Sequence, residues 1–351
     1  LPILGVYAGI DLHSSNSYLA IIDEKDKRLY GKKLPNEMGK ILIALDPFKK
    51  DVKGIVVEST YNWYWLVDGL QSQGYPIHLA NPATIKQYEG LKHTDDKWDA
   101  FWLAHMLRLN ILPEGYIYPR EIRPVRDLLR RRLLFVRQRT TQILSFQSMI
   151  TRNLGIRLSC QDIKTFKEEE VDNMFDSYHL ALTAKSNIAT IRFLSARVKE
   201  IEKAVRGLIK PTQAFRYLKT IPGIGDILGF TILLEVGDIH RFAKVGNYSS
   251  YCRCVKSQRL SNGKKKGKNN AKNGNKYLSW AYIEAANFTT RYCPLAQRFY
   301  QKKAAKTNKV IALKALSNKL ARASYYIMRD LVPYDRNKLF GEKAQTEQEM
   351  S

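Results

Sequence analysis

The sequence has few of the residues that build zinc sites, disulfides or membrane spans. Its four cysteines and six histidines contain no CxxC pair, no HExxH motif and no zinc-finger spacing. The cysteine pattern therefore argues against zinc and favours a reducing compartment, which we expect to be the bacterial cytoplasm. The central apolar run at residues 227–234 stops at Glu235 and is too short to cross a bilayer. The first ten residues lack the basic segment of a signal peptide. We expect no contact with a membrane.

Acidic residues are also scarce, and the resulting positive charge is unevenly distributed. The net charge is +25, yet residues 1–112 contain 13 basic and 13 acidic residues, so the whole excess falls on residues 113–351. A surplus this localised indicates a nucleic-acid partner rather than a membrane. The electrically balanced first part is left to supply carboxylate chemistry.

Carboxylates in the first part occur where an active site is expected. Asp11 follows the apolar run at residues 6–10, and Glu58 follows the run at residues 54–57. Three more acids, Asp95, Asp96 and Asp99, begin an amphipathic helical pattern. Both spacings to Asp99, three and four residues, place a pair on one helix face. Carboxylate oxygens are the ligands of hard cations, which predicts a metal site for Mg²⁺, with Mn²⁺ as the alternative ion, formed by Asp11, Glu58, Asp99 and either Asp96 or Asp95.

Simpler interpretations of the same residues exist. Acids at a helix start complement the helix dipole without any metal, and Thr94 or Asp95 would serve as an N-cap. Asp11 would likewise fit an ordinary hairpin turn before residues 13–16. The order of the four acids within about ninety residues favours the metal site.

The first part has the pattern of an α/β domain. Strands are predicted at residues 6–11, 17–23, 28–34, 54–58 and 77–80, with helices at 40–48 and 63–73 and another leading to the acidic cluster. This order fits a five-stranded mixed sheet flanked by helices, the layout of RNase H-like (RuvC-like) nucleases, which we assign to residues 1–115. The strand-Asp, strand-Glu, helix-Asp-x-x-Asp order is the acidic tetrad of that fold.

Arginines dominate the next segment. Residues 120–154 contain arginine and apolar residues at helical spacing. After a loop at 155–170, residues 174–209 form a second stretch with helical periodicity. The two predict a long α-helical coiled-coil hairpin over residues 116–211. Arginine suits phosphate contacts on structured RNA or DNA, and the residues expected to make them are Arg120, Arg123, Arg126, Arg130, Arg131 and Arg137.

The remainder, residues 212–341, reads as mostly α-helical. Pro-Gly-Ile-Gly at residues 222–225 predicts a helix-hairpin-helix element, in which Gly223 and Gly225 let backbone amides approach a phosphate. A plain tight turn is the alternative. Residues 253–276 hold nine basic and no acidic residues between two helical patterns, which favours a loop that orders on a polyanion over a solvated tail. Its expected contacts are Lys264, Lys265, Lys266, Lys268 and Lys272. Residues 342–351 read as a frayed tail.

Several of these motifs together resemble the transposases of the insertion sequence 110 family, which act as RNA-guided DNA recombinases. The resemblance covers nearly the whole chain. It rests on Gly9-Ile10-Asp11, Val57-Glu58-Ser59-Thr60, Asn81-Pro82, residues 94–104, Ile221-Pro222-Gly223-Ile224-Gly225, residues 235–242, the turn at residues 261–263, and residues 273–278 leading into Ala285-Ala286.

The resemblance implies a RuvC-like DEDD domain, a coiled coil and a C-terminal transposase domain whose serine nucleophile is Ser261. It also implies a noncoding guide RNA, donor and target DNA, and a homo-oligomer, a dimer that assembles into a tetramer. Two departures leave choices open. An extra aspartate makes Asp95 a competitor of Asp96, of which we prefer Asp96 by its spacing to Asp99. Ser261 is not directly followed by glycine, so Ser257 is a competitor.

The predicted function is therefore that of a transposase, a DNA recombinase of a mobile element guided by a noncoding bridge RNA. The chain lacks the GxxxxGK[ST] loop of nucleotide-driven enzymes, so rejoining requires a covalent intermediate that conserves the phosphodiester bond, and a phosphoserine formed with the help of Mg²⁺ does so. The alternative enzyme is a RuvC-like, metal-only junction nuclease with a C-terminal DNA-binding domain. A third reading is a nucleic-acid-binding protein without chemistry, which the acidic tetrad argues against.

Overall fold

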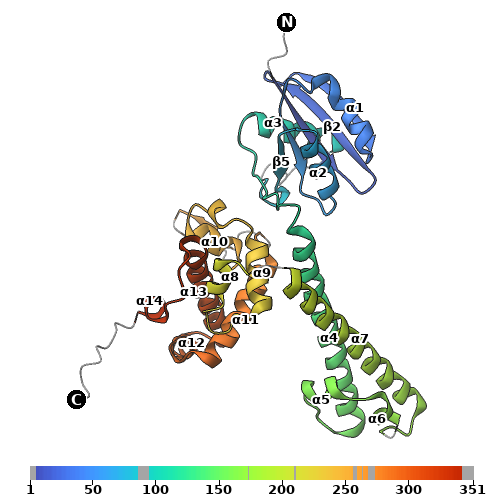
Figure 1. The fold of residues 1–351 in the computed structure, drawn as a ribbon, viewed down its shortest axis with the longest axis vertical. Helices are drawn as coiled ribbons and strands as arrows, with labels where there is room; N and C mark the ends of the chain where they lie inside the picture. Colours follow the sequence, from blue (N-terminus) through green and yellow to red (C-terminus); the bar gives the residue numbers. More distant parts are fainter. Residues whose placement is uncertain are drawn as a thin grey trace, which may run out of the picture. The chain divides into compact units, whose positions relative to one another are not determined.

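The computed structural model describes residues 5–85, 95–172, 174–208, 211–255, 259–262, 264–267 and 273–341. Among the predicted site residues, Ser257, Lys268 and Lys272 lie outside these ranges, as do the side chains of Ser261 and Lys265. The chain divides into two compact units, Leu1–Arg120 and Glu121–Ser351, which are described one at a time (Figure 1). Within the described ranges, every helix is too short or too polar to cross a membrane.

The first unit is built on a five-stranded sheet. Its strands are β1 (Val6–Leu12), β2 (Asn16–Asp23), β3 (Arg28–Pro35), β4 (Val52–Glu58) and β5 (Ile77–Ala80), in the order β3-β2-β1-β4-β5. Strands β1, β2 and β3 pair antiparallel, whereas β4 runs parallel to β1 and β5 parallel to β4. The predicted mixed α/β sheet is confirmed, with each strand within two residues of its expected ends.

Helices cover both faces of this sheet (Figure 1). Side chains alternate along each strand, so Ala8 and Ile10 join the core under α1 (Met38–Leu45) and α2 (Tyr64–Ser72). Gly9 and Asp11 then face α3 (Asp96–Arg108) on the other side. Two short 3₁₀ turns, Asp46–Phe48 and Pro82–Thr84, complete the unit. Its predicted helix at residues 40–48 is thus split into α1 and a 3₁₀ turn, which Pro47 favours by lacking an N–H.

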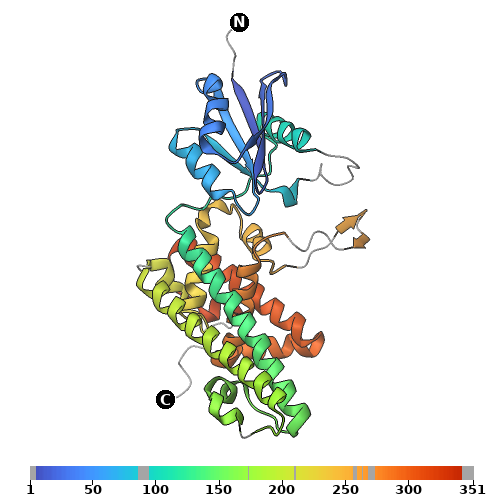
Figure 2. The same cartoon turned by 90° about the vertical axis from the view of Figure 1, so that its right-hand side faces the viewer.

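The second unit begins with two long antiparallel helices, α4 (Arg123–Leu154) and α7 (Tyr178–Leu208), which lie side by side (Figure 2). Arg132 bonds to Glu202 and Arg139 to Ser195, so the partners run in opposite directions. The predicted helical hairpin is present, while its coiled-coil geometry stays a prediction. The prediction of a loop over residues 155–170 is wrong in part, because two short helices, α5 (Cys160–Thr165) and α6 (Glu168–Asp172), form there. Their apolar residues pack in one cluster with Phe146 and Ile150.

The rest of this unit is mostly helical, as predicted. Tyr248 and Tyr282, both fully buried and hydrogen-bonded to each other over 2.5 Å, lie in its core. The helices are α8 (Gln213–Leu218), α9 (Asp226–Val236), a 3₁₀ turn (Ile239–Arg241), α10 (Val245–Tyr251), α11 (Lys276–Tyr292), α12 (Pro294–Lys306), α13 (Lys309–Asp330) and α14 (Arg336–Phe340).

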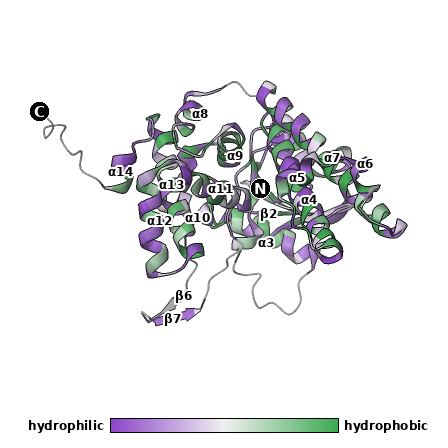
Figure 3. Cartoon of the chain, turned by 90° about the horizontal axis from the view of Figure 1, so that it is seen from below, coloured by the Kyte–Doolittle hydropathy of each residue, from purple (hydrophilic) through white to green (hydrophobic). Residues whose placement is uncertain are grey.

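The basic segment contains a small antiparallel ribbon instead of an irregular loop. Strands β6 (Arg259–Ser261) and β7 (Lys264–Gly267) pair with Ser261 opposite Lys264. Asn262 between them has a left-handed φ of 49°, as Asn-Gly hairpin turns require. The ribbon stands apart from the helices of its own unit (Figures 2 and 3), and Figure 3 shows β7 in hydrophilic colours.

Candidate functional site

Asp11 and Glu58 are brought together by strand pairing. Because β1 and β4 are parallel and Ile10 pairs with Val57, the next residue on each strand reaches the same point of the sheet. Both side chains face α3, and the two carboxyl groups form a hydrogen bond. Asp11 is only 3% exposed. Two acids in contact this deep in a protein require a proton or a cation between them.

The absence of a side chain at Gly9 allows α3 to approach the two acids. A Cβ at Gly9 would lie 2.0 Å from the backbone oxygen of Ala100 and 2.8 Å from the backbone nitrogen of Ala104. The helix therefore lies directly on the β1 backbone. This contact sets the distance between Asp11 and the first turn of α3, which contains Asp96 and Asp99.

The two consecutive aspartates have different surroundings. Asp95 is exposed, and its Oδ1 caps α3 by accepting a hydrogen bond from the Trp98 backbone N–H at 2.6 Å. Asp96 is in contact with His13 Nε2 at 3.1 Å and with Lys33 Nζ at 3.2 Å. The capping interpretation thus applies to Asp95, while Asp96 points toward the acidic cluster.

His13 is a site residue that the sequence reasoning missed. Its Nε2 lies 3.1 Å from Asp11 Oδ2 and 3.1 Å from Asp96 Oδ1. Among the described residues, Asp11, His13 and Asp96 form the one group of three whose ligand atoms all lie within 4.8 Å of one another. The sequence signal was the position of His13, two residues beyond a strand-ending acid; its second partner comes from a helix far along the chain.

The carboxylates of the cluster repel one another, and this repulsion changes their pKa values. Burial, together with the hydrogen bond to Asp11 and the repulsion from Asp11 and Asp99, raises the pKa of Glu58 to about 7. Burial and the repulsion from Asp11, Asp96 and Asp95 raise the pKa of Asp99 to about 6. Burial also raises the pKa of Asp11. Burial acts the same way on Asp96, but the hydrogen bonds from Lys33 and His13 outweigh it and lower the pKa.

These features fit a divalent cation. Asp11, Glu58 and Asp99 disfavour their own ionised forms, and a positive ion among them would reverse this effect. The oxygen donors suit Mg²⁺ or Mn²⁺, and the imidazole of His13 is a donor that Mn²⁺ also accepts more readily than Mg²⁺. Asp11, His13 and Asp96 are the described residues whose donor atoms are close enough to share an ion. Glu58 and Asp99 lie outside that group, but both interact electrostatically with Asp11 and could join it.

The predicted phosphate-binding arginines divide into two groups. Arg120, Arg131 and Arg137 are exposed, and Arg120 is 3.8 Å from Asp68. Arg123 and Arg126 are buried, at 4% and 7% exposure. A buried guanidinium cannot meet a phosphate backbone, so Arg123 and Arg126 have to be corrected from expected contacts to internal residues.

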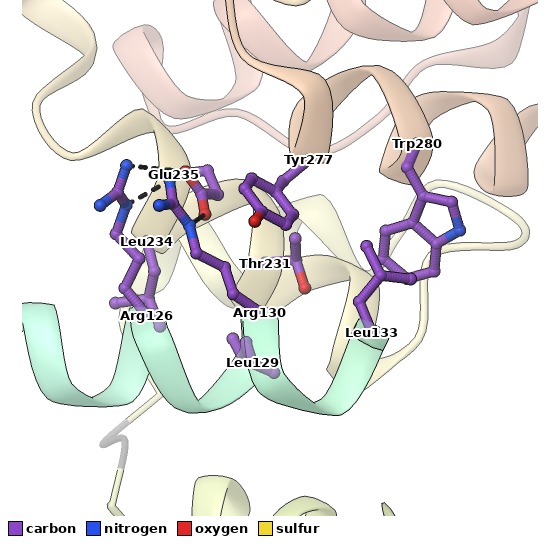
Figure 4. Close-up of a pocket in the computed structure, with 9 residues that line it drawn as sticks. All are labelled: Arg126, Leu129, Arg130, Leu133, Thr231, Leu234, Glu235, Tyr277 and Trp280. Carbon is purple, nitrogen blue, oxygen red and sulfur yellow. Dashed lines mark hydrogen bonds and ion pairs between the residues drawn. The ribbon is translucent and has the colours of Figure 1, made fainter. Parts of the chain in front are cut away.

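Arg126 and Arg130 both bind the buried carboxylate of Glu235 on α9 (Figure 4). Arg126 Nε donates to Glu235 Oε2 at 3.0 Å and Arg130 Nη2 donates to the same oxygen at 2.8 Å. Asn275, the N-cap of α11, donates to it from Nδ2 at 2.7 Å. Burial would raise the pKa of Glu235, but the arginines outweigh it and lower the pKa. Arg130, which also stacks on Tyr277, is thus corrected in the same way. The cluster joins α4, α9 and α11.

The two glycines of residues 222–225, Gly223 and Gly225, have different surroundings. Gly223 has a φ of +97°, and a Cβ there would lie 2.7 Å from the Phe288 Cβ. Thr289 Oγ1 donates to Pro222 O at 2.6 Å. The turn therefore packs on α11, and this packing alone requires a glycine at position 223; its expected role at a phosphate stays a prediction. Gly225 is exposed at the N-terminus of α9 with open space beside it.

The basic ribbon keeps its exposed cations. Lys264 and Lys266 are exposed on β7. At its base, Arg253 Nε donates to Gly274 O at 3.0 Å and Asn275 N donates to Tyr251 O at 2.6 Å. The two ends of the basic segment are therefore held together, next to the Asn275 that binds Glu235.

Comparisons with known proteins agree with these features. Residues 8–153 match a family model of the DEDD part of IS110 transposases, described as "Transposase". Residues 215–301 match the family model described as "Transposase IS116/IS110/IS902 family". The chain is similar to the transposase for insertion sequence element IS1111A of Coxiella burnetii (strain RSA 493 / Nine Mile phase I), with 23% identity over 293 residues, which cover 81% of this chain and 78% of the relative. The first match includes Asp11, Glu58, Asp96 and Asp99, and the second includes the basic ribbon. The two matches cover the N-terminal and the C-terminal motifs on which the predicted resemblance rests. The chain therefore belongs to the IS110 family of transposases.

Proposed function

We propose that this transposase cleaves and rejoins DNA strands at a divalent metal site formed by Asp11, Glu58, Asp96 and Asp99. The observation that supports this most is the convergence of one buried and three half-buried carboxyl groups on one side of the sheet, with pKa values raised to about 7 for Glu58 and about 6 for Asp99. A structural role alone would favour neutral residues at such positions. The ion is Mg²⁺, with Mn²⁺ as the alternative.

The bound ion would supply Lewis-acid stabilisation of charge on the phosphate. The protein residues prepare the site for this. Asp11 and Glu58 are fixed by the sheet, and Gly9 lets α3 bring Asp96 and Asp99 to them. His13 connects Asp11 to Asp96, and Lys33 holds the second oxygen of Asp96.

Ser261 is the proposed nucleophile. Its Oγ forms a bond to the phosphorus, the bond from phosphorus to one deoxyribose oxygen breaks, and that oxygen takes up a proton. The phosphoserine conserves one ester linkage, so an incoming strand end reverses the step without a nucleotide cofactor. Ser261 ends β6 and pairs with Lys264, whose side chain is exposed and suits a phosphate. Ser257 is the competing serine.

The exposed cations are the proposed contacts for nucleic acid. Arg120, Arg131 and Arg137 would bind a noncoding guide RNA, while Gly225 and the basic segment, with Lys264, Lys265, Lys266, Lys268 and Lys272, would neutralise the phosphates of donor and target DNA. The chain would act as a dimer that assembles into a tetramer, in which one protomer supplies the acidic site and another the serine.

Strand cleavage tests the metal site directly. Purified protein should cleave DNA carrying its element ends with Mg²⁺ and not in chelator, and Asp99→Ala should bind the same DNA without cleaving it. Cleavage in chelator would contradict the site. With a suicide substrate the protein should become covalently attached to DNA; cleavage without an adduct would instead favour the alternative function, a metal-only junction nuclease.

Two further measurements test the partners. Protein purified at moderate salt should carry RNA of defined length, and changing that RNA should change the DNA site that is cut. Mixing Asp99→Ala with Ser261→Ala protein should restore cleavage if the two sites come from different protomers. A mixture that stays inactive while each variant still oligomerises would mean that both come from one chain.

A further inference from the structure

Helix α3 carries a column of aromatic rings beside the acidic cluster. Trp98 stacks on Trp102 with ring centroids 5.3 Å apart and planes 13° apart, and Trp102 stacks on His105 at 5.1 Å and 25°. The spacing of four and three residues places the three rings on one face of the helix. Trp98 is the first ring of the column and belongs to the first turn of α3, as do Asp96 and Asp99.

The His105 end of this column is held by hydrogen bonds. His105 Nδ1 lies 2.9 Å from Asp26 Oδ1, and Arg108 Nε donates to the same oxygen at 2.9 Å. Both bonds hold the pKa of Asp26 down against the effect of burial, so its carboxylate stays charged. The imidazole cannot rotate without losing this bond. The column is thus a rigid surface, which costs a ligand little in conformational entropy.

An open cavity of about 170 Å³ adjoins the column, several times the roughly 30 Å³ that one water occupies. Trp98, Phe101 and Trp102 line it together with Arg28 and Asp26. The Arg28 guanidinium lies 4.3 Å from the centroid of the Phe101 ring. The Trp102 Nε1 atom is buried and, within the part of the chain that is described, has no hydrogen-bond acceptor. A flat ligand here would meet aromatic surface and the Arg28 cation, while the Trp102 N–H lies beneath that surface.

We propose that this column and cavity bind an unpaired base of the DNA strand that enters the acidic site. A base has a flat π surface that stacks on Trp98, and the phosphate that it carries suits the Arg28 guanidinium. The column lies within two helical turns of Asp99, roughly 10 Å along α3, so a strand held at the carboxylates passes beside it. This inference rests on the proposed function, since it names how that site holds its DNA.

The test is the binding of a fluorescein-labelled single-stranded oligonucleotide to the full-length protein in chelator, measured at several salt concentrations. Trp98→Ala should weaken binding roughly 5- to 150-fold, the loss of one stacked base. Because no phosphate contact is removed, the salt dependence should keep its slope. Trp98→Phe should restore most of the affinity. Tyr178→Ala, which removes an aromatic side chain that is 72% exposed on α7, serves as the matched control.

Equal affinities of Trp98→Ala and Tyr178→Ala protein for the single strand would overturn the proposal. It would also be overturned if Trp98→Ala weakened the binding of duplex DNA, or of RNA of the same sequence, as much as the binding of single-stranded DNA. If Trp98→Ala fails to fold, quenching of tryptophan fluorescence by the oligonucleotide decides: the Trp98→Phe variant must lose part of the quenching, or the proposal is wrong. Cleavage by the unmutated protein with Mg²⁺ is assayed in parallel, so failure of the metal site and failure of base stacking are told apart.

Discussion

Gly9 on β1 and Ala100 on α3 touch so closely that no side chain fits between them, since a Cβ at Gly9 would lie 2.0 Å from the Ala100 backbone oxygen. In the contact, Ala100 directly follows Asp99 and lies about one turn from Asp96, while Gly9 lies two residues from Asp11. It makes the geometry of the acidic cluster a consequence of a backbone contact between strand and helix. The site is therefore sensitive to a residue that has no side chain and no charge.

The Gly9→Ala variant should lose metal binding. Its added methyl group has to push α3 away from β1, an overpacking that costs about 1–3 kcal/mol, and the shift separates Asp96 and Asp99 from Asp11. We expect the rise in melting temperature produced by Mg²⁺ in the unmutated protein to disappear. Gly39→Ala on α1 is the control, because open space surrounds that position, and alanine there should be neutral or stabilising. A Gly9→Ala protein that still responds to Mg²⁺ would refute this account.

Asp96 and Asp95 should respond differently to neutralisation. Asp96→Asn removes a carboxylate that lies in the cluster, so the Mg²⁺ affinity measured by titration calorimetry should fall. Asp95→Asn leaves a good N-cap in place, so both the affinity and the stability should hold. The reverse result would assign the metal to Asp95.

Trapping of a covalent protein-DNA complex distinguishes Ser261 from Ser257 as the nucleophile. Ser261→Ala protein should bind RNA and DNA but form no covalent complex with suicide DNA, because its hydroxyl is the nucleophile. Ser257→Ala protein should form the complex as the unmutated protein does. An adduct retained by Ser261→Ala and lost by Ser257→Ala would exchange the two assignments.

The exposed and buried arginines predict different salt behaviour. Removing Arg131 or Arg137 should lower RNA affinity and reduce the slope of affinity against salt by roughly one unit each. Arg126→Ala should act on folding instead, because its guanidinium is buried against Glu235. Salt-dependent filter binding combined with urea unfolding distinguishes the two effects. Unchanged slopes for both Arg131→Ala and Arg137→Ala would mean that α4 does not hold the RNA.

Glu235 should control stability in acid. Its pKa is lowered in the folded protein, so its ionised form adds stability above the ordinary pKa near 4.5, and this contribution is lost as the pH falls through the lowered value. Glu235→Gln leaves the buried Arg126 and the half-buried Arg130 without their counter-charge, which costs about 3–5 kcal/mol at neutral pH. Urea unfolding at neutral and acid pH should show a smaller acid loss in this variant. The exposed Glu200, paired with Arg197, is the control, and Glu200→Gln should change little.

Much of the first unit was decided by the sequence itself. Short apolar runs set the strands, and the carboxylates at their ends followed, because parallel neighbouring strands bring equivalent residues to one edge. The spacing of Asp96 and Asp99 likewise fixed one helix face. These are local properties, so the five-stranded mixed sheet and its acidic residues could be predicted, and the family motifs agreed with them.

Only the tertiary structure decided which neighbours each residue has. His13 became a partner of Asp96, and Asp95 became a cap. The arginine pattern predicted a helix but could not show that Arg126 finds Glu235, 109 residues away, whereas Arg131 faces solvent. Helical periodicity gives the direction in which a side chain points around the helix axis. What lies in that direction, a carboxylate, a packed helix or water, depends on how distant segments pack.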